Sequence, residues 1–342
     1  MKKVLCMVVS VLLCAVFLYC CKGEEKETPK DSIPPVTENT TEAVEDNEKT
    51  ICGDIEELCE YGGILSVKKC AYGELSAIDI SSLNEEAREV YEGISETLTY
   101  QVMYEVDGCK VSAYISAPAD YLDTYYPIVI YNRGGNGNIG ANTAMTVATC
   151  SYYTKSLVVA SNYREASPGT GKDQFGGEDV FDVAYLIEMT KSIGFADRDR
   201  VYMIGESRGG MQTCLALLQD TEGLVKGVCC VSGAYDLIDT YNNRSDMRKM
   251  LEERIGGSPE NCKEEYLKRS AVTFADKIDI PILLIHSIND QRVSYSQVEE
   301  FAEELEKHGK EYELVTRNDS VHCISSPNEF CYIMEWFSEI SN

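Results

Sequence analysis

Gly205-Glu-Ser-Arg-Gly-Gly210 directly follows the apolar run Val201-Tyr-Met-Ile204. This order describes a strand that ends in a sharp turn carrying Ser207, with glycines where side chains would collide with the sheet. A helix pointing its positive dipole end at the serine would favour binding of a tetrahedral oxyanion there. The stretch therefore predicts a nucleophilic serine, although a glycine-rich turn with an ordinary surface serine also fits the pattern alone. The helix is indicated by apolar residues at helical spacing, namely Met211, Cys214, Leu215 and Leu218.

A nucleophilic serine needs a neighbouring base and an acid that orients the base. The sequence has three histidines, His286, His308 and His322. The apolar run ending at His286 predicts a buried parallel strand, and Asp290 follows at its carboxyl end, where the acid belongs. His322 ends a polar loop after a short last strand. The order Ser207, Asp290, His322 is the nucleophile, acid and base order of the α/β-hydrolase fold.

The other histidines and acids have simpler explanations. His308 follows an amphipathic helical pattern, so it is expected at a solvated helix end. His286 lies only four positions before Asp290 and is expected to be packed at the end of its strand. Asp236, which follows another predicted strand, competes with Asp290 as the acid, and Asp319 is expected in a turn.

Further stretches follow one another from about Tyr100 to the C-terminus. They are Tyr131-Asn-Arg-Gly-Gly135, Asn162-Tyr-Arg164, Gly171-Lys-Asp-Gln-Phe-Gly-Gly-Glu-Asp179, Asp199-Arg-Val201, Arg269-Ser270 and Ile285-His-Ser-Ile-Asn-Asp-Gln-Arg-Val293. Together with the serine turn and His322, they resemble the catalytic domain of the prolyl oligopeptidase family of serine peptidases. The resemblance implies an α/β-hydrolase fold and cleavage through an acyl-enzyme. Members that cleave oligopeptides usually have a gating β-propeller, and the residues before Tyr100 are too few for one, so we expect an open site.

The resemblance also bears on the oxyanion hole. Some members use a tyrosine hydroxyl in the segment equivalent to residues 131–135, where this sequence has Arg133. We therefore expect backbone donors, the N–H of Arg208 and an N–H of Arg133 or Gly134, each lowering the barrier by about 3 kcal/mol. The Arg133 side chain could instead bind a substrate carboxylate or pair with an acid.

A competing motif lies in the same loop. Gly135-Asn-Gly-Asn-Ile-Gly140 follows a predicted strand and matches the G-x-G-x-x-G of dinucleotide-binding folds, with Glu165 available for a ribose. That fingerprint needs a helix that begins at the glycines, whereas a glycine-rich loop over an acyl site explains the same residues. No C-x-x-C pair or histidine cluster has metal-ligand spacing. We therefore expect neither a cofactor nor a metal.

The N-terminus is typical of an exported protein. Lys2 and Lys3 precede an apolar stretch that runs to Cys21, which predicts a signal peptide or a membrane anchor over residues 1–21. Leu18, three positions before Cys21, resembles a bacterial lipoprotein signal, in which Cys21 would carry the lipid. Residues 22–50 are rich in Glu, Thr and Pro and are expected to form a disordered acidic tether. The bulk of the chain would then lie outside the cytoplasm, tethered to the membrane or secreted.

The rest of the chain predicts one catalytic domain with an extension. Residues 51–97 suggest short helices that pack on the domain, which spans residues 98–342. Two alternating strands joined through Asp107-Gly108 predict an antiparallel hairpin that opens the sheet. Apolar strands that alternate with helical patterns predict a mostly parallel, doubly wound sheet after it. A mostly polar helical insertion over about 237–280 is placed where related enzymes have a cap.

The charge balance restricts the partners. With 31 basic and 57 acidic residues, the formal net charge is −26, which disfavours nucleic acid because the chain would repel it. We expect a small peptide as substrate, with carboxylesterase activity on acyl esters or a catalytically silent binding protein as alternatives. Several of the 15 cysteines, such as Cys214 and Cys229-Cys230, lie in apolar patterns and are expected to be buried hydrophobic residues. The oligomeric state is not indicated by the sequence.

Overall fold

The computed structural model describes residues 51–71 and 83–341. The predicted signal or anchor over residues 1–21, the lipidation site Cys21 and the predicted tether over residues 22–50 lie outside the described residues. Within the two described ranges, no helix is long and apolar enough to cross a membrane.

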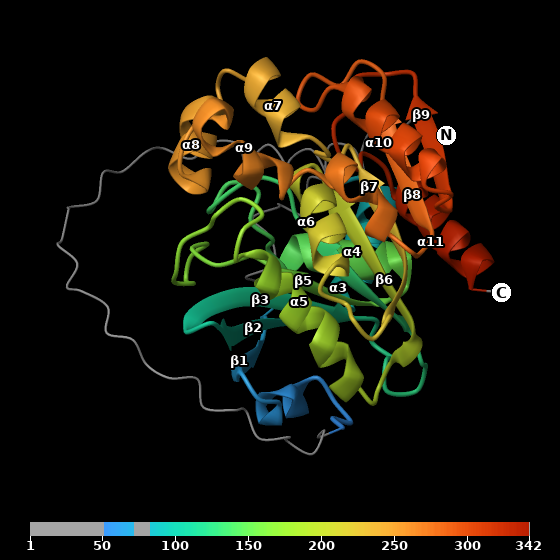
Figure 1. The fold of residues 1–342 in the computed structure, drawn as a ribbon. Coiled ribbons are helices and arrows are strands. Elements are labelled where there is room, and N and C mark those ends of the chain that lie inside the picture. The colour runs from blue at the N-terminus through green and yellow to red at the C-terminus, as the bar shows by residue number, and fades with distance from the viewer. Residues whose placement is uncertain (1–50, 72–82, 342) are drawn as a thin grey trace.

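Nine strands form one mixed sheet in the described part of the chain, in the order β1-β2-β3-β5-β4-β6-β7-β8-β9 (Figure 1). The six strands from β4 to β9 are parallel, while β1, β2 and β3 each pair in antiparallel fashion. The predicted α/β-hydrolase type of sheet is confirmed. The strands are β1 (Ile64–Lys69), β2 (Leu98–Val106), β3 (Cys109–Ala117), β4 (Pro127–Asn132), β5 (Leu157–Ser161), β6 (Asp197–Glu206), β7 (Val225–Val231), β8 (Ile282–Ser287) and β9 (Tyr312–Arg317).

The hairpin of β2 and β3 forms where the turn residues predict it. Asp107 and Gly108 connect the strands, and both have positive φ, at 51° and 71°. Glycine and aspartate tolerate this region, and two consecutive residues in it match the right-handed twist of a hairpin. Nine residue pairs then align from Leu98–Ala117 to Val106–Cys109.

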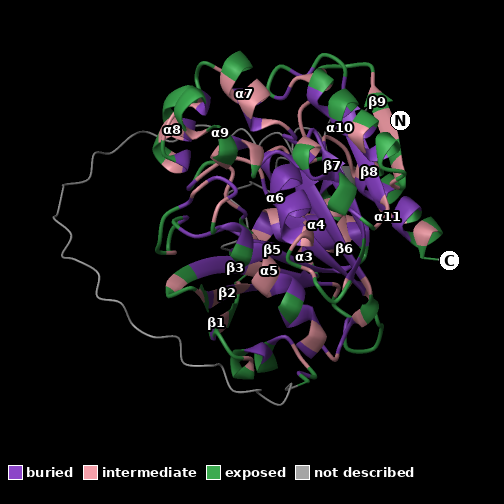
Figure 2. Cartoon of the chain, in the orientation of Figure 1, coloured by how far each residue is buried: buried purple, intermediate pink, exposed green. Residues whose placement is uncertain are grey.

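Helices cover both faces of the sheet because neighbouring residues of each strand point to opposite faces. In β4, Ile128 and Ile130 belong to one core and Val129 and Tyr131 to the other. The first core is covered by α5, α6 and α10, and the second by α4 and α11. Burial is concentrated in the sheet and in α6 (Figure 2). These helices are α4 (Ala144–Thr154), α5 (Val180–Met189), α6 (Arg208–Leu217), α10 (Tyr295–Lys307) and α11 (Pro327–Ile340).

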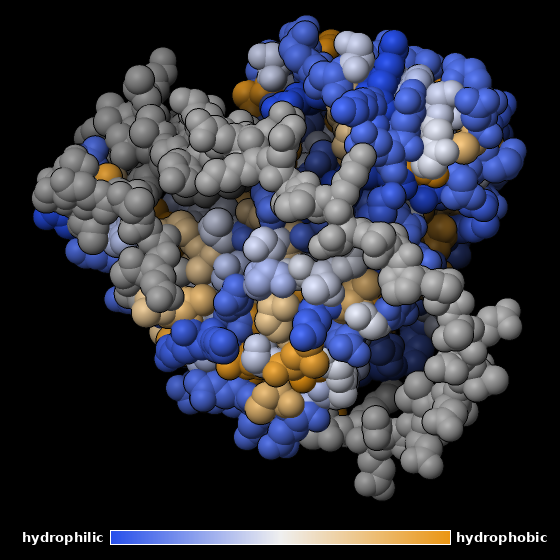
Figure 3. All heavy atoms as spheres, turned by 90° about the vertical axis from the view of Figure 1, so that its left-hand side faces the viewer, coloured by the Kyte–Doolittle hydropathy of each residue, from blue (hydrophilic) through white to orange (hydrophobic). Residues whose placement is uncertain are grey.

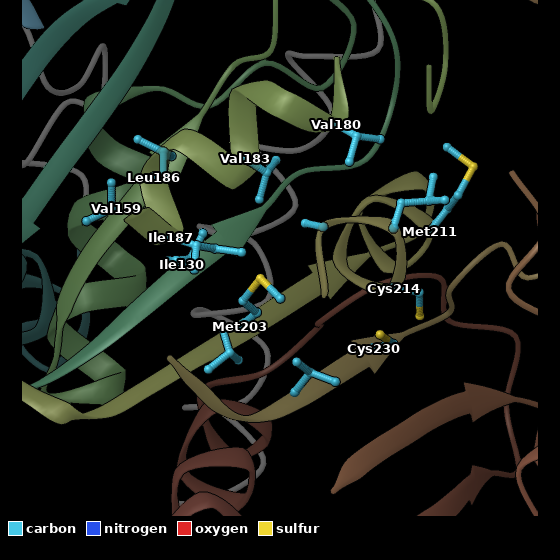
Figure 4. Packing of buried hydrophobic residues seen from close by; sticks show 14 of the residues in the cluster. Ile130, Val159, Val180, Val183, Leu186, Ile187, Met203, Met211, Cys214 and Cys230 are labelled. Carbon is cyan, nitrogen blue, oxygen red and sulfur yellow. The ribbon is translucent and has the colours of Figure 1, made fainter. Parts of the chain in front are cut away.

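The core below α6 consists of aliphatic and sulfur-containing side chains (Figure 4). Met203 of β6 packs there with Met211 and Cys214 of α6 and Cys230 of β7, and the thiols of Cys214 and Cys230 face each other. Cys214, Cys229 and Cys230 are fully buried, as predicted from their apolar surroundings. The helix that follows Ser207 is therefore fixed against the sheet by close packing.

The extension over residues 51–97 is not only helical, contrary to the expectation. It contains the short 3-10 helix η1 (Glu56–Glu60) and the helix α3 (Glu85–Ser95), but Ile64–Lys69 forms the edge strand β1 and pairs with β2. Cys52 also makes an isolated parallel bridge with Ile193, next to the 3-10 helix η3 (Thr190–Ser192). The extension thus completes one edge of the sheet.

The region predicted as a cap, residues 237–280, connects β7 to β8. It forms α7 (Leu237–Asn243), α8 (Arg248–Ile255), α9 (Pro259–Leu267) and the 3-10 helices η4 (Ala271–Thr273) and η5 (Ala275–Lys277). α7, α8 and α9 lie at the top of Figure 1. At this height, hydrophilic side chains make up most of the described surface in Figure 3, whereas hydrophobic side chains gather lower on that face.

Candidate active site

Ser207 lies in a strained turn between β6, which ends at Glu206, and α6, which begins at Arg208. Its φ of 56° and ψ of −121° fall in a region that a residue with a side chain rarely adopts. The backbone holds this conformation from two sides. The Ser207 N–H donates to the Val231 carbonyl at 3.0 Å, and the Ser207 carbonyl accepts from Ala234 at 3.1 Å. The side chain is half-buried, and the turn has the strand-to-helix geometry in which α/β-hydrolases present a nucleophilic serine.

The glycines around Ser207 are required by close backbone contacts. A Cβ on Gly205 would overlap the Gly209 carbonyl, and a Cβ on Gly209 would overlap the Asn132 carbonyl. A Cβ on Gly134 would lie 3.1 Å from Ser207 Cβ. The predicted steric reason for the glycines is confirmed, and the backbone at Gly134 lies beside the serine, where an oxyanion donor is expected.

Asp290 and His322 meet although 32 residues separate them. His322 Nδ1 lies 2.7 Å from Asp290 Oδ2, and the Asp290 side chain is fully buried. Asp290 Oδ1 accepts from the Arg292 and Val293 N–H groups at 2.8 and 3.2 Å. Burial raises the pKa of Asp290, but the His322 contact and these N–H groups outweigh it and lower the pKa to about 2. The ionised carboxylate orients the imidazole and leaves Nε2 as the nitrogen that can take a proton.

The loop that carries His322 is joined to the strand that carries Ser207. The Ile324 N–H donates to Glu206 Oε1 at 2.6 Å, and the Cys323 N–H donates to Ser232 Oγ at 3.4 Å. Within the described chain, neither the Ser207 hydroxyl nor His322 Nε2 makes a hydrogen bond. In serine hydrolases without substrate, the hydrogen bond between the serine hydroxyl and the histidine is often long, and it tightens when substrate binds.

The competing candidates all have structural roles. His286 is fully buried on β8, with Nε2 3.1 Å from the Val293 carbonyl and 3.6 Å from Asp290 Oδ2, and burial lowers its pKa. His308 follows the C-terminus of α10, 3.7 Å from a carboxylate oxygen. Asp236 caps the N-terminus of α7 through its side chain. Asp319 accepts from the Val321 N–H in a turn.

Arg133 cannot bind a substrate carboxylate in this arrangement, which corrects one expectation. Its guanidinium group is 2% exposed and stacks on the Tyr163 ring at 4.8 Å. It donates only to backbone carbonyls, those of Asn162, Gly134, Gly137 and Ile139, at 2.6 to 3.1 Å. The side chain therefore shapes the glycine-rich loop beside Ser207 and pairs with no acid of residues 51–71 or 83–341.

A buried ion-pair network behind Ser207 was not predicted. Arg208 Nη1 lies 2.6 Å from Asp173 Oδ2, and Arg208 Nη2 lies 2.7 Å from Asp179 Oδ2. All three side chains are at most 2% exposed. Burial raises the pKa of Asp173, but Arg208 holds it well below its usual range. The signal that could have found it is the run Gly171–Asp179, in which acidic residues and glycines directly precede the helix that starts at Val180.

The cap is fastened close to the same network. Arg254 of α8 donates to Glu165 Oε2 at 2.8 Å and to the Asp173 carbonyl at 2.6 Å. Glu165 is thus used in the cap contact, and α4 begins at Ala144, beyond the last glycine of the G-x-G-x-x-G match. These two findings disfavour a dinucleotide site.

A cavity of about 420 Å³ opens between α7 and the loop that carries Asp290.

The chain is similar to known proteins of one family. The prolyl oligopeptidase family model matches residues 161–341. The uncharacterized peptidase YtmA of Bacillus subtilis (strain 168) is 31% identical over 196 residues, which cover 57% of this chain and 74% of that protein. The dipeptidyl peptidase family member 6 of Caenorhabditis elegans is 30% identical over 165 residues, covering 46% of this chain and 22% of that protein.

A solved structure shows the same fold. The acylaminoacyl peptidase of Pyrococcus horikoshii superposes with a TM-score of 0.62 at 22% identity, covering 75% of this chain and 44% of that chain. The present chain therefore spans less than half of that enzyme.

Proposed function

Since the chain belongs to the prolyl oligopeptidase family and is a serine hydrolase of the peptidase type, we propose that Ser207, His322 and Asp290 are its nucleophile, base and acid. The observation that carries the proposal is the 2.7 Å contact between His322 Nδ1 and the buried Asp290 carboxylate. It is supported by the strained backbone of Ser207 and by the hydrogen bond that joins the His322 loop to Glu206.

The proposed reaction has two steps. Ser207 Oγ attacks the substrate carbonyl while His322 Nε2 accepts its proton, and Asp290 stabilises the imidazolium that forms. His322 then returns the proton to the leaving group, which departs and leaves an acyl-enzyme. Water attacks the acyl carbon with His322 again as base, which releases the acid and restores Ser207.

The oxyanion is held by backbone N–H groups in this proposal. The Arg208 N–H is at the N-terminus of α6, and Gly134 lies against Ser207. An N–H from Arg133 or Gly134 supplies the second donor. The Arg133 side chain supports this second donor. Its hydrogen bonds to four backbone carbonyls fix the loop that presents the N–H groups of Arg133 and Gly134.

A small peptide is the proposed substrate. The two relatives described above carry the name peptidase, and the cap region consists only of short helices, of which α8 is fastened through Arg254. For location, we propose an extracytoplasmic enzyme tethered to the membrane through a lipid on Cys21. The mass of the mature N-terminus tests the location, because a chain that still begins at Met1 would contradict lipidation.

The experiment for the activity combines a probe and a substrate panel. The native protein is expected to be labelled by a fluorophosphonate and to cleave peptide p-nitroanilides faster than p-nitrophenyl esters, relative to the spontaneous rates. Ser207→Ala removes both activities, whereas Ser296→Ala, an exposed serine on α10, retains them. Hydrolysis that persists in pure Ser207→Ala protein would refute the proposal, and a clear preference for esters would make the enzyme a carboxylesterase.

A further inference from the structure

Glu206 is a buried carboxyl group directly before the proposed nucleophile. It is the last residue of β6 and is 2% exposed. Both oxygens are used, since the Tyr131 hydroxyl donates to Oε2 at 2.5 Å and the Ile324 N–H donates to Oε1 at 2.6 Å. A buried carboxyl group costs free energy unless it is hydrogen-bonded, and one placed beside a reacting serine needs an explanation.

The two partners of Glu206 belong to different parts of the site. Tyr131 lies on β4, immediately before the loop that approaches Ser207 with Gly134. Ile324 lies two residues after His322, and Cys323 between them has a φ of 68°. The carboxyl group therefore connects the strand of the nucleophile to the loop of the base through one side chain.

The other contacts of this loop hold it from the opposite direction. Arg317 of β9 donates to the Val321 and Cys323 carbonyls at 2.8 and 3.0 Å, and Ser287 of β8 donates to the Val321 carbonyl. These bonds attach the loop to its own end of the sheet. The Cys323 N–H also donates to Ser232 after β7, and Glu206 is the contact between the loop and β6, the strand that ends directly before Ser207.

We propose that Glu206 is a positioning residue, which holds the His322 loop against the strand of Ser207 through the Ile324 N–H. This inference rests on the proposed roles of Ser207 and His322. Glu206 does not touch the reacting atoms, so its removal changes turnover through the placement of the imidazole. Displacing a catalytic group by about 1 Å costs about 100-fold in rate.

The ionisation of Glu206 offers a readout that a merely structural role would not give. Burial raises its pKa, Glu329 of α11 adds to this, and the Tyr131 and Ile324 donors and Arg317 lower it, so the pKa is about 7. The hydrogen bond from Ile324 is stronger to the ionised carboxylate than to the neutral acid. The remaining groups that face it stay neutral because burial raises the pKa of each, namely Tyr131 and the thiols of Cys150, Cys229 and Cys323.

The test compares Glu206→Gln with Glu206→Ala in the full chain. Glutamine keeps an oxygen for the Ile324 N–H but cannot ionise, so kcat at pH 9 is expected to fall only about fivefold, with KM unchanged. The acid limb of log(kcat/KM) against pH is expected to lose one ionisation near pH 7. Alanine removes the anchor, and kcat is expected to fall about 100-fold.

Two tyrosine variants complete the set. Tyr131→Phe removes a donor that favours the ionised carboxylate, so the acid limb is expected to shift to higher pH. Tyr104→Phe is the matched control, because the Tyr104 hydroxyl is equally buried on β2 and bonds to Ser161 and the Asp182 carbonyl away from the site. Its pH profile is expected to match that of the native protein.

The outcomes separate the two proposals. If Ser207→Ala remains active, the proposed function fails whatever Glu206 does. If Ser207→Ala is inactive but Glu206→Gln has the native number of ionisations and the native kcat, the positioning role is overturned. Should Glu206→Ala fail to fold, the Gln variant and Tyr131→Phe still decide the question.

Discussion

The two halves of the site are held in different ways. On the nucleophile side, Arg208 pairs with Asp173 and Asp179, and all three side chains are shielded from water. On the base side, His322 is carried by a loop whose residues 318–320 are exposed and whose attachments go mainly to backbone atoms. In the proposed mechanism, the half that stabilises a developing negative charge is fixed by a buried ion-pair network, and the half that moves a proton is fixed mainly by hydrogen bonds to the backbone of the His322 loop, including the one to buried Glu206.

This difference indicates what each half contributes. A buried ion pair adds little net stability compared with apolar packing, but the loss of one partner leaves an uncompensated charge. We therefore interpret the pairing of Arg208 with Asp173 and Asp179 mainly as a contact that fixes the backbone next to Ser207. Removing a charge is therefore expected to lower the stability of the fold on the Arg208 side and to lower turnover on the His322 side.

The largest effect is expected on the base side, from Asp290→Asn. The variant keeps the shape of the side chain but no longer holds the imidazole in the required tautomer, so kcat is expected to fall on the order of 10⁴-fold. Asp236→Asn is the control, because asparagine also caps a helix and Asp236 lies outside the proposed triad. Steady-state kinetics on a peptide substrate measure both. A small loss for Asp290→Asn with a large loss for Asp236→Asn would exchange the two assignments.

The next effect is expected on the nucleophile side, from Arg208→Met. Methionine fills much of the space but leaves Asp179 without its cation and Asp173 with only the more distant Arg254, so the free energy of unfolding is expected to fall by about 3 to 5 kcal/mol. Arg200→Met removes an exposed arginine that pairs with Asp197 and is expected to cost less than about 1 kcal/mol. Urea denaturation measures both values. Similar stability losses for Arg208→Met and Arg200→Met would contradict the claim that buried ion pairs fix the nucleophile side of the site.

The smallest effect concerns acid stability. The pKa of Asp290 is about 2 in the folded protein, below its value in an unfolded chain, so its pairing stabilises the fold above pH 4. This contribution, about 2 kcal/mol, is lost as the pH falls from 4 through 2. The Asp290→Asn variant lacks it, and its urea midpoint should therefore change less over this range than that of the native protein. Parallel curves for the two proteins would mean that the carboxylate is not paired in solution.

The sequence predicts the fold and the meeting of Asp290 with His322, because both depend on short patterns. The glycines around Ser207, the Asp107-Gly108 turn and the strands that precede Asp290 and His322 each act through local backbone geometry. The catalytic roles of these residues remain predictions. Strand β1 was missed because its sequence, Ile-Leu-Ser-Val-Lys-Lys, lacks a strict alternation, and only its pairing with β2 makes it a strand.

The buried polar side chains could not be predicted in the same way. A carboxylate partner was one alternative for the Arg133 side chain, but its partners are carbonyls of a loop and of Asn162, which the three-dimensional path of the chain brings together. Asp173, Asp179 and Glu206 have no periodicity that separates them from the many surface acids of this chain. Their burial arises from contacts with residues that are distant in the sequence, and these contacts cannot be predicted from short sequence patterns.

The position of Ile51 affects how the enzyme is presented to its surroundings. The described chain starts beside η1 and β1 at the bottom of Figure 1, and the cap helices lie at the top. Any support attached through the preceding residues would therefore hold the domain by the end remote from its cap.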